Sequence, residues 1–173
     1  MKRLFSVLMA VFAWCQTSCG VRGSVHGPEA HHHDAEIAEL ETIIGAALPP
    51  DYRQWLQSGD LTVPAKDFYW VVPGEWGSGI ECFYGFQPPY DLREFNRERK
   101  ERKIPADLLL IGDDGMAGTS IALGISGRRT GAVYFIDTTG VEYGSVASDH
   151  SIHLIGKSFS SWTKALSTNP DEG

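Results

Sequence analysis

The residues of this chain best suited to chemistry lie between Gly112 and Gly118, where Asp113 and Asp114 stand side by side. Two carboxylates can bind a cation, but calcium loops place their oxygen ligands at alternate positions, so that several converge on one ion. Adjacent aspartates do not meet that spacing. We therefore predict a glycine-rich turn between two strands rather than a metal site, with an exposed acidic recognition loop as the alternative.

A second candidate is the segment 149–153, which brings Asp149, His150 and His153 close together in sequence. Two imidazoles and a carboxylate could bind a metal ion or serve a hydrolase as acid and base. In a strand, however, the two histidines would point to opposite faces. A structural role is favoured, and a His-dependent metal-binding hydrolase is kept as the lesser alternative.

The established motifs of enzymes are missing from the sequence. It has no G-x-S-x-G elbow, no H-E-x-x-H pair, no phosphate-binding P-loop and no dinucleotide-binding glycine pattern. We therefore predict that the protein is not an enzyme, and we name no catalytic residue, no cofactor and no metal ligand.

The charge of the chain indicates the kind of partner. Fifteen Lys and Arg stand against 22 Asp and Glu, a net charge of −7 over 173 residues. Nucleic-acid binding depends on basic contacts to phosphate, so nucleic acid is not expected as a ligand, whereas a basic protein would be attracted. Residues 93–103 hold six basic and three acidic residues, which leaves 9 − 19 = −10 for the remainder. This segment is interpreted as a solvated helix face with i,i+4 ion pairs such as Arg97–Glu101, and a docking helix is the alternative.

Aromatic and acidic side chains alternate in the middle of the chain. Trp76 and Tyr84 lie close in sequence to Glu75 and Glu81. Tryptophan and tyrosine are frequent at the energetic centres of protein interfaces. These residues could form a partner surface, or they could be half-buried in a sheet.

The first twenty residues resemble an export signal, because Lys2 and Arg3 precede an apolar run from Leu4 to Trp14. Cys19 resembles the lipid-attachment cysteine of bacterial lipoproteins. A Gly- and His-rich linker (21–33), a folded domain (34–167) and a short tail (168–173) follow. The protein is expected to be exported or envelope-anchored if this leader functions and cytoplasmic otherwise, with a lipid anchor as its only membrane contact.

The elements that must position these residues are helices at both ends of the domain and strands between them. Apolar residues at helical spacing predict a first helix capped by Asp34, a second helix from Asp51 and a last helix capped by Ser158. Short aliphatic and aromatic runs predict five strands, at 68–72, 80–84, 108–111, 119–123 and 132–137. This order predicts an α+β fold with a single mixed, mostly antiparallel sheet and the helices packed against it.

The order of the motifs resembles the SUKH superfamily, the Smi/Knr-like domain. The helix from Ile37 to Gly45 and the run from Leu48 to Leu56 look like the family's opening motif, and Leu109 to Gly115 with Gly118 resembles its central glycine-rich turn. The segments 131–137 and 155–166 are similar to the strand and the closing helix that follow. The chain departs from the pattern in two places, with Ser58-Gly59-Asp60 where Asn-Gly-Gly is usual, and with Gly124 where an acidic residue is frequent.

The resemblance implies a non-enzymatic binding domain, in bacteria most often an immunity protein that binds and neutralises a cognate toxin. The expected partner is a basic toxin domain, and an envelope-anchored scaffold or regulatory interaction domain is the alternative. The predicted contact residues are Asp60, Trp76, Glu81, Asp113 and Asp114.

Overall fold

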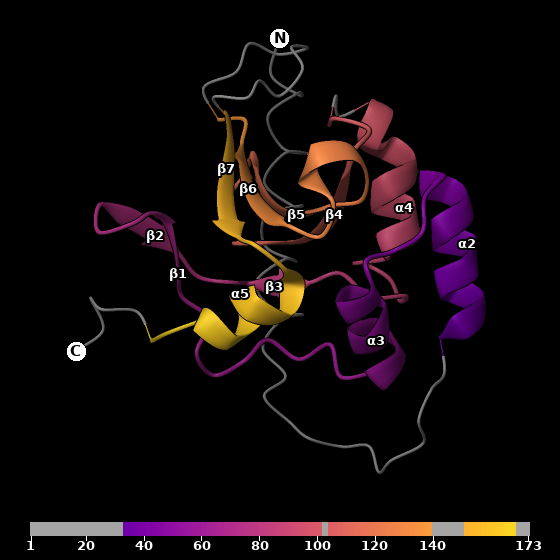
Figure 1. Cartoon of the computed structure of the whole chain (residues 1–173), viewed down its shortest axis with the longest axis horizontal. Helices are drawn as coiled ribbons and strands as arrows, with labels where there is room; N and C mark the ends of the chain where they lie inside the picture. The colour runs from indigo at the N-terminus through magenta and orange to yellow at the C-terminus, as the bar shows by residue number, and fades with distance from the viewer. Residues whose placement is uncertain (1–32, 102–103, 140–150, 169–173) are drawn as a thin grey trace, which may run out of the picture.

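The computed structural model describes residues 33–101, 104–139 and 151–168. In chain order the elements are α2 (Asp34–Ile44), α3 (Pro50–Ser58), β1 (Tyr69–Val72), β2 (Trp76–Ser78), β3 (Cys82–Phe83), α4 (Leu92–Arg97), η1 (Glu98–Lys100), β4 (Leu108–Asp113), β5 (Thr119–Gly124), η2 (Gly127–Arg129), β6 (Val133–Asp137), β7 (Ile152–Gly156) and α5 (Phe159–Ala165) (Figure 1). The predicted α+β fold is confirmed.

Five strands form one antiparallel sheet in the order β3-β4-β5-β6-β7, which is also their order along the chain. The sequence predicted a single sheet, whereas β1 and β2 form a separate two-stranded hairpin. A tight turn explains the local pairing: Glu75 N–H donates to the Val72 carbonyl at 3.0 Å, and Gly74 has a φ of 76°. Pro73 and Gly74 suit the two central positions of a type II turn.

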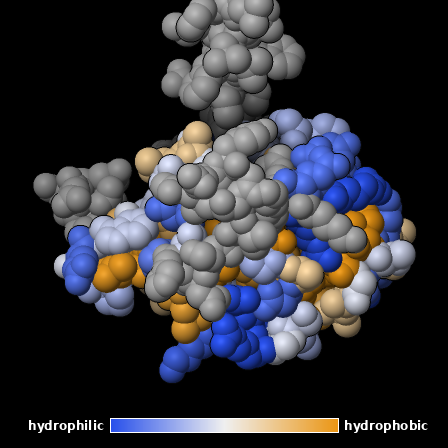
Figure 2. Space-filling view, turned by 90° about the horizontal axis from the view of Figure 1, so that it is seen from above, coloured by the Kyte–Doolittle hydropathy of each residue, from blue (hydrophilic) through white to orange (hydrophobic). Residues whose placement is uncertain are grey.

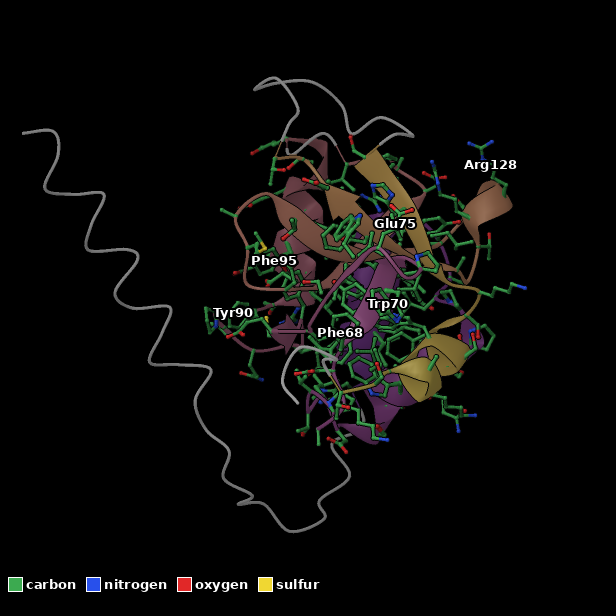
Figure 3. The ribbon with its side chains drawn as sticks, turned by 90° about the vertical axis from the view of Figure 1, so that its left-hand side faces the viewer. Phe68, Trp70, Glu75, Tyr90, Phe95 and Arg128 are labelled. Atoms are coloured by element: carbon green, nitrogen blue, oxygen red, sulfur yellow. The ribbon has the colours of Figure 1, made fainter. Side chains whose placement is uncertain are left out.

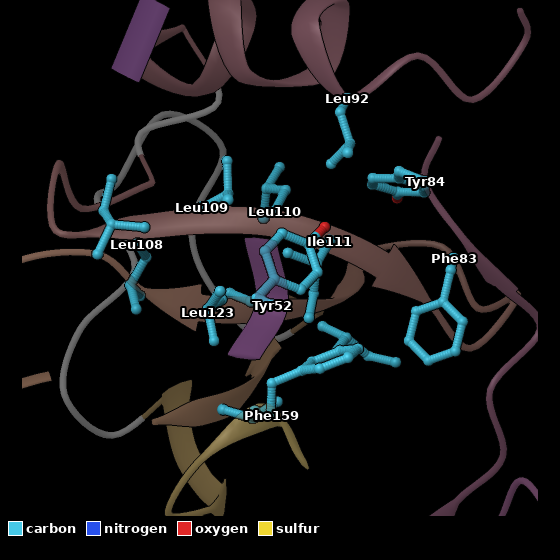
Figure 4. Packing of buried hydrophobic residues seen from close by; sticks show 14 of the residues in the cluster. Tyr52, Phe83, Tyr84, Leu92, Leu108, Leu109, Leu110, Ile111, Leu123 and Phe159 are labelled. Carbon is cyan, nitrogen blue, oxygen red and sulfur yellow. The ribbon is translucent and has the colours of Figure 1, made fainter. Parts of the chain in front are cut away.

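Helices cover both faces of the sheet. Figure 4 shows Leu92 of α4 on one side of β4 and Phe159 of α5 on the other. The hairpin of β1 and β2 lies on the same face of the five-stranded sheet as α5. Its Tyr69 ring packs against Phe135 of β6 and Trp162 of α5 at centroid distances of 6.2 and 5.7 Å. Strand β4 is therefore buried on both faces, which explains its continuous apolar sequence.

The first and last helices form largely as their sequences predict. In α2 the buried residues Ile37, Leu40 and Ile44 follow the apolar spacing, and Gly45 ends the helix with a φ of 70°. Asp34 was expected to cap this helix but is its first helical residue. Ser158 does cap α5, in a reciprocal capping box with Ser161.

The basic segment after β3 has the solvated face that the sequence predicted, with Glu94, Arg97 and Glu98 exposed, but its ion pairs differ from the predicted ones. Arg93 and Arg97 of α4 both reach Glu39 of α2, at 2.9 and 2.6 Å, so the i,i+4 pair Arg97–Glu101 is replaced by a bond between helices. Arg99 is buried and donates to the Ile44 carbonyl at 3.0 Å, at the end of α2. The guanidinium groups of Arg93, Arg97 and Arg99 thus hold α4 and η1 against α2.

Two contacts close the edges of these sheets. Asn96 of α4 is 2 % exposed, and its amide bonds the backbone of Leu110 on β4. Phe68, just before β1, pairs with Ser167 after α5 through two backbone hydrogen bonds of 2.9 and 3.0 Å. The hairpin is therefore attached to the segment that follows the last helix.

The predicted leader, including Cys19, and the linker up to residue 32 lie outside the described residues. Within the described residues, no helix is long and apolar enough to cross a membrane.

Candidate partner-binding surface

Carboxylates gather at one end of the five-stranded sheet. In an antiparallel meander the end of β4 lies beside the start of β5, the end of β6 and the start of β3. Glu81 precedes β3, Asp113 ends β4 and Asp114 follows it, and Asp137 ends β6 in register with Thr119. We call Glu81, Asp113, Asp114 and Asp137 the acidic end.

Basic residues lie at the opposite end of the same strands. Arg128 and Arg129 are in η2 between β5 and β6, and Lys157 follows β7. Arg129 binds Asp107, just before β4, at 2.8 Å, and Arg128 extends from η2 in Figure 3. Arg128 and Lys157 therefore lie at the end of the sheet opposite to the acidic end.

Asp113 has a structural role in addition to its charge. Its Oδ2 accepts a hydrogen bond from the Tyr84 hydroxyl at 2.9 Å and one from Cys82 Sγ at 3.6 Å, while Oδ1 accepts from the Gly115 N–H at 3.0 Å. The side chain thus joins Cys82 of β3 and Tyr84, which follows β3, to the glycine-rich turn. It is only half-buried, so its negative charge still reaches the surface.

Asp114 fixes the hairpin to the sheet. Its Oδ2 accepts from Ser78 Oγ of β2 at 2.8 Å, and its Oδ1 accepts from the Met116 N–H and from the Thr119 hydroxyl. The two adjacent aspartates therefore hold different partners, which agrees with the predicted turn. Within the described part of the chain, no group of three His, Cys, Asp or Glu side chains could hold a metal ion.

Apolar side chains are exposed beside these carboxylates. Trp76 of β2 lies edge-on against Phe135 and His153, at centroid distances of 5.5 and 6.0 Å, and 39 % of it remains exposed. Met116, in the turn between β4 and β5, is 63 % exposed. The hairpin projects at the left of Figure 2 with hydrophobic and hydrophilic residues side by side. Tryptophan and methionine are both enriched in protein interfaces.

The structure brings together four of the five predicted contact residues. Trp76, Glu81, Asp113 and Asp114 lie at or beside the acidic end, but Asp60 follows α3 and accepts a hydrogen bond from the Thr62 N–H. Among the described residues, no hydrogen bond or ion pair joins Asp60 to the acidic end.

Sequence reasoning missed Asp137 and Met116. The register of β5 with β6 places Asp137 at this end, and the exposure of Met116 is visible only in the folded turn. An acidic residue at the end of an apolar strand was the one signal available for Asp137.

The histidine candidates are only partly placed. His150 lies outside the described residues, and His153 lies on β7 beside Trp76. His153 acts electrostatically on Asp137, whose pKa is held below its usual value chiefly by hydrogen bonds from Thr139. His153 therefore lies where the hairpin packs against the five-stranded sheet.

Comparison with protein families decides the relationship that the motifs indicated. Residues 32–165 match the SMI1 / KNR4 family (SUKH-1). The chain belongs to this family. No curated protein and no solved structure matches it.

The structure explains one departure from the SUKH pattern. At Gly124, where an acidic residue is frequent in the SUKH superfamily, a Cβ atom would lie 1.7 Å from the backbone oxygen of Arg129. No side chain fits there unless the η2 connection moves. In this chain, two backbone segments therefore approach each other closely at Gly124.

Proposed function

We propose that this SUKH-1 domain is a non-enzymatic immunity protein, which binds and neutralises a cognate bacterial toxin through its acidic end. The observation that carries the proposal is the combination of Asp114 and Asp137 with the exposed side chains of Trp76 and Met116 on one surface. Interfaces of high affinity commonly have an aromatic or methionine centre surrounded by polar groups.

A basic toxin domain is the partner that this surface fits best. Nuclease toxins must bind phosphate groups, so their active clefts are basic, and an acidic protein can occupy such a cleft in place of the nucleic acid. Opposite charges accelerate association, and salt screens that acceleration. The basic residues at the other end of the sheet point away from such a partner and would orient the domain during the encounter.

The proposal is tested by co-purifying the full chain with the toxin domain encoded beside it and by measuring toxin activity with and without the chain. We expect a stoichiometric complex, loss of toxin activity and weaker binding at higher salt. A toxin that retains full activity at saturating concentrations of the chain, with no complex formed, would overturn the proposal.

The compartment depends on residues 1–20. If the predicted export occurs, the toxin must act in the envelope, or the protein is an envelope-anchored scaffold instead. Fractionation of cells and mass spectrometry of the N-terminus separate these cases, because a lipidated Cys19 has a characteristic mass.

A further inference from the structure

A set of contacts encloses a small patch at the acidic end. On one side, Asp114 binds Ser78 of β2 at 2.8 Å and also the hydroxyl of Thr119, the first residue of β5. Thr119 is in register with Asp137 of β6. Both carboxylates are therefore neighbours of Thr119, Asp114 through a hydrogen bond and Asp137 through the register of the strands.

On the other side of the patch lies the indole of Trp76. Its ring packs on Phe135, which precedes Asp137 by two residues and so shares its face of β6. Trp76 also precedes Ser78 by two residues on β2, so the two side chains lie on the same face of the hairpin. Ser78 in turn binds Asp114. An exposed indole is thereby held beside two carboxylates by strands that come from three parts of the chain.

Both carboxylates keep capacity to accept further hydrogen bonds. Thr139 occupies Oδ1 of Asp137 through its N–H and its hydroxyl, at 2.8 and 2.6 Å. Among the described residues, Oδ2 of Asp137 has no hydrogen-bond donor. Oδ2 of Asp114 accepts only from Ser78 there, whereas a carboxylate oxygen can accept two such bonds.

The buried Tyr69 adds an independent observation. Tyr69 is paired with Ser78 across the hairpin and is 4 % exposed, and its hydroxyl has no hydrogen-bond partner of good geometry within the described residues. Burial, followed by the charge of Asp114, raises the pKa of this phenol, while Ser78 acts in the opposite direction. A buried neutral phenol therefore lies within electrostatic range of Asp114 and leaves the charge of that carboxylate unchanged.

We propose that Trp76, Asp114 and Asp137 form a receptor for one arginine side chain of the protein partner. The inference rests on the proposed function and specifies the chemistry of its interface. A guanidinium group is planar, so it can lie on the indole face and donate to a carboxylate at its edge. A lysine ammonium is not planar, so it fits the indole face and the carboxylate edge less well. Asp114 adds a second negative charge to that of Asp137.

The test is a titration of the isotope-labelled full chain with N-acetyl-arginine amide, followed by NMR of the tryptophan indole N–H signals. The Trp76 signal is assigned from the variant Trp76→Phe. We expect a saturable shift of this signal with a dissociation constant on the order of millimolar, as for a weak single contact. The citrulline analogue, which is planar but uncharged, serves as the ligand control and should give no saturable shift.

Matched variants identify the receptor. Trp76→Ala and Asp137→Asn should each weaken arginine binding by about two- to fivefold, the range expected for one cation–π contact or exposed ion pair. Trp70→Ala, on the outward face of the same hairpin (Figure 3), and Glu94→Gln, on α4, should leave it unchanged. For Trp76→Ala the binding is followed on backbone amides of β6, which also report whether the fold is intact.

The inference is overturned by equal shifts with arginine and citrulline, by no saturable shift, or by an equal loss in Trp70→Ala. The proposed function is judged separately, by toxin inhibition. A chain that inhibits the toxin but does not bind arginine amide at Trp76 overturns only the receptor. A chain that binds arginine amide but leaves the toxin active overturns only the immunity function.

Discussion

The side-chain amide of Asn96 bonds both backbone polar groups of Leu110. Its Nδ2 donates to the Leu110 carbonyl at 3.0 Å, and its Oδ1 accepts from the Leu110 N–H at 3.0 Å. Strand β3 pairs with β4 at Cys82 and Phe83, and the Tyr84 N–H then donates to the Ile111 carbonyl at 2.9 Å. Beyond them Asn96 takes the position that a neighbouring strand would occupy, and it completes the edge of the sheet from a helix.

Replacing Asn96 by Ala should therefore lower the free energy of unfolding by about 1–3 kcal/mol, because buried polar groups of Leu110 lose their partners. Urea unfolding followed by circular dichroism measures the difference. Gln57→Ala is the control, since it removes an exposed side-chain hydrogen bond to Asp34 and should change stability by less than about 0.5 kcal/mol. Equal effects of the two substitutions would contradict a sheet-completing role for Asn96.

Asp51 connects α3 to α5 across 109 positions of sequence, through bonds of 2.9 and 2.8 Å from the Ser160 N–H and hydroxyl to its Oδ2. Burial alone would raise the pKa of Asp51, but these bonds and one from the Tyr52 N–H outweigh it and lower the pKa. Asp51→Ala should reduce the free energy of unfolding by about 1–2 kcal/mol at pH 7.

The same difference should depend on pH. Because the pKa of Asp51 is lower in the folded state, the carboxylate stabilises the fold above its unfolded pKa of about 3.9, and this stabilisation is lost as pH falls through the folded-state value. The gap between wild type and Asp51→Ala should therefore shrink between about pH 4 and pH 2 in denaturant titrations. A gap that widens in acid would contradict this assignment.

Gly124→Ala should destabilise the domain by about 2 kcal/mol or more, since the new Cβ would meet the Arg129 backbone and not a movable side chain. Gly45→Ala is the matched control: Gly45 has a φ of 70° and open space around it, so only conformational strain of about 1 kcal/mol is expected. Thermal unfolding of both variants measures the difference. A smaller loss at Gly124 than at Gly45 would show that the η2 connection adjusts easily.

The acidic end should govern the rate of association with a basic toxin. In stopped-flow measurements at low salt, the double variant Glu81→Gln with Asp137→Asn should associate more slowly, and the deficit should disappear as salt rises. Asp113→Asn and Asp114→Asn are unsuitable because both side chains hold the fold together. Glu94→Gln removes one charge elsewhere and should change the rate little. Equal slowing by Glu94→Gln would indicate that only net charge matters.

Local sequence signals predicted the helices whose limits are set by interactions between residues close in sequence. The apolar spacing of Ile37, Leu40 and Ile44, and the Ser158 cap, were enough for α2 and α5. Strand β2 was missed because it has only three residues and its central residue is glycine, which is depleted in strands. It pairs because the preceding turn folds it onto β1.

Contacts between segments far apart in the chain could not be predicted from local sequence signals. Arg93 and Arg97 are 54 and 58 positions from Glu39, so sequence spacing offered only the neighbours within α4 as partners. Asp113 and Asp114 were recognised as acidic, but their bonds to Tyr84 and Ser78 depend on the packing of β3 and of the hairpin. Their predicted role at an interface remains a prediction, whereas their structural role is visible.

The backbone pairing of Phe68 with Ser167 has a practical consequence for anyone who handles this protein. A truncation upstream of Ser167 removes the strand-like segment that fastens the base of the hairpin carrying Trp70 and Trp76. An affinity tag or fluorescent fusion joined directly after Ser167 would begin next to that hairpin. Labels for binding studies are therefore better placed away from this junction, so that the label does not disturb the hairpin whose binding is measured.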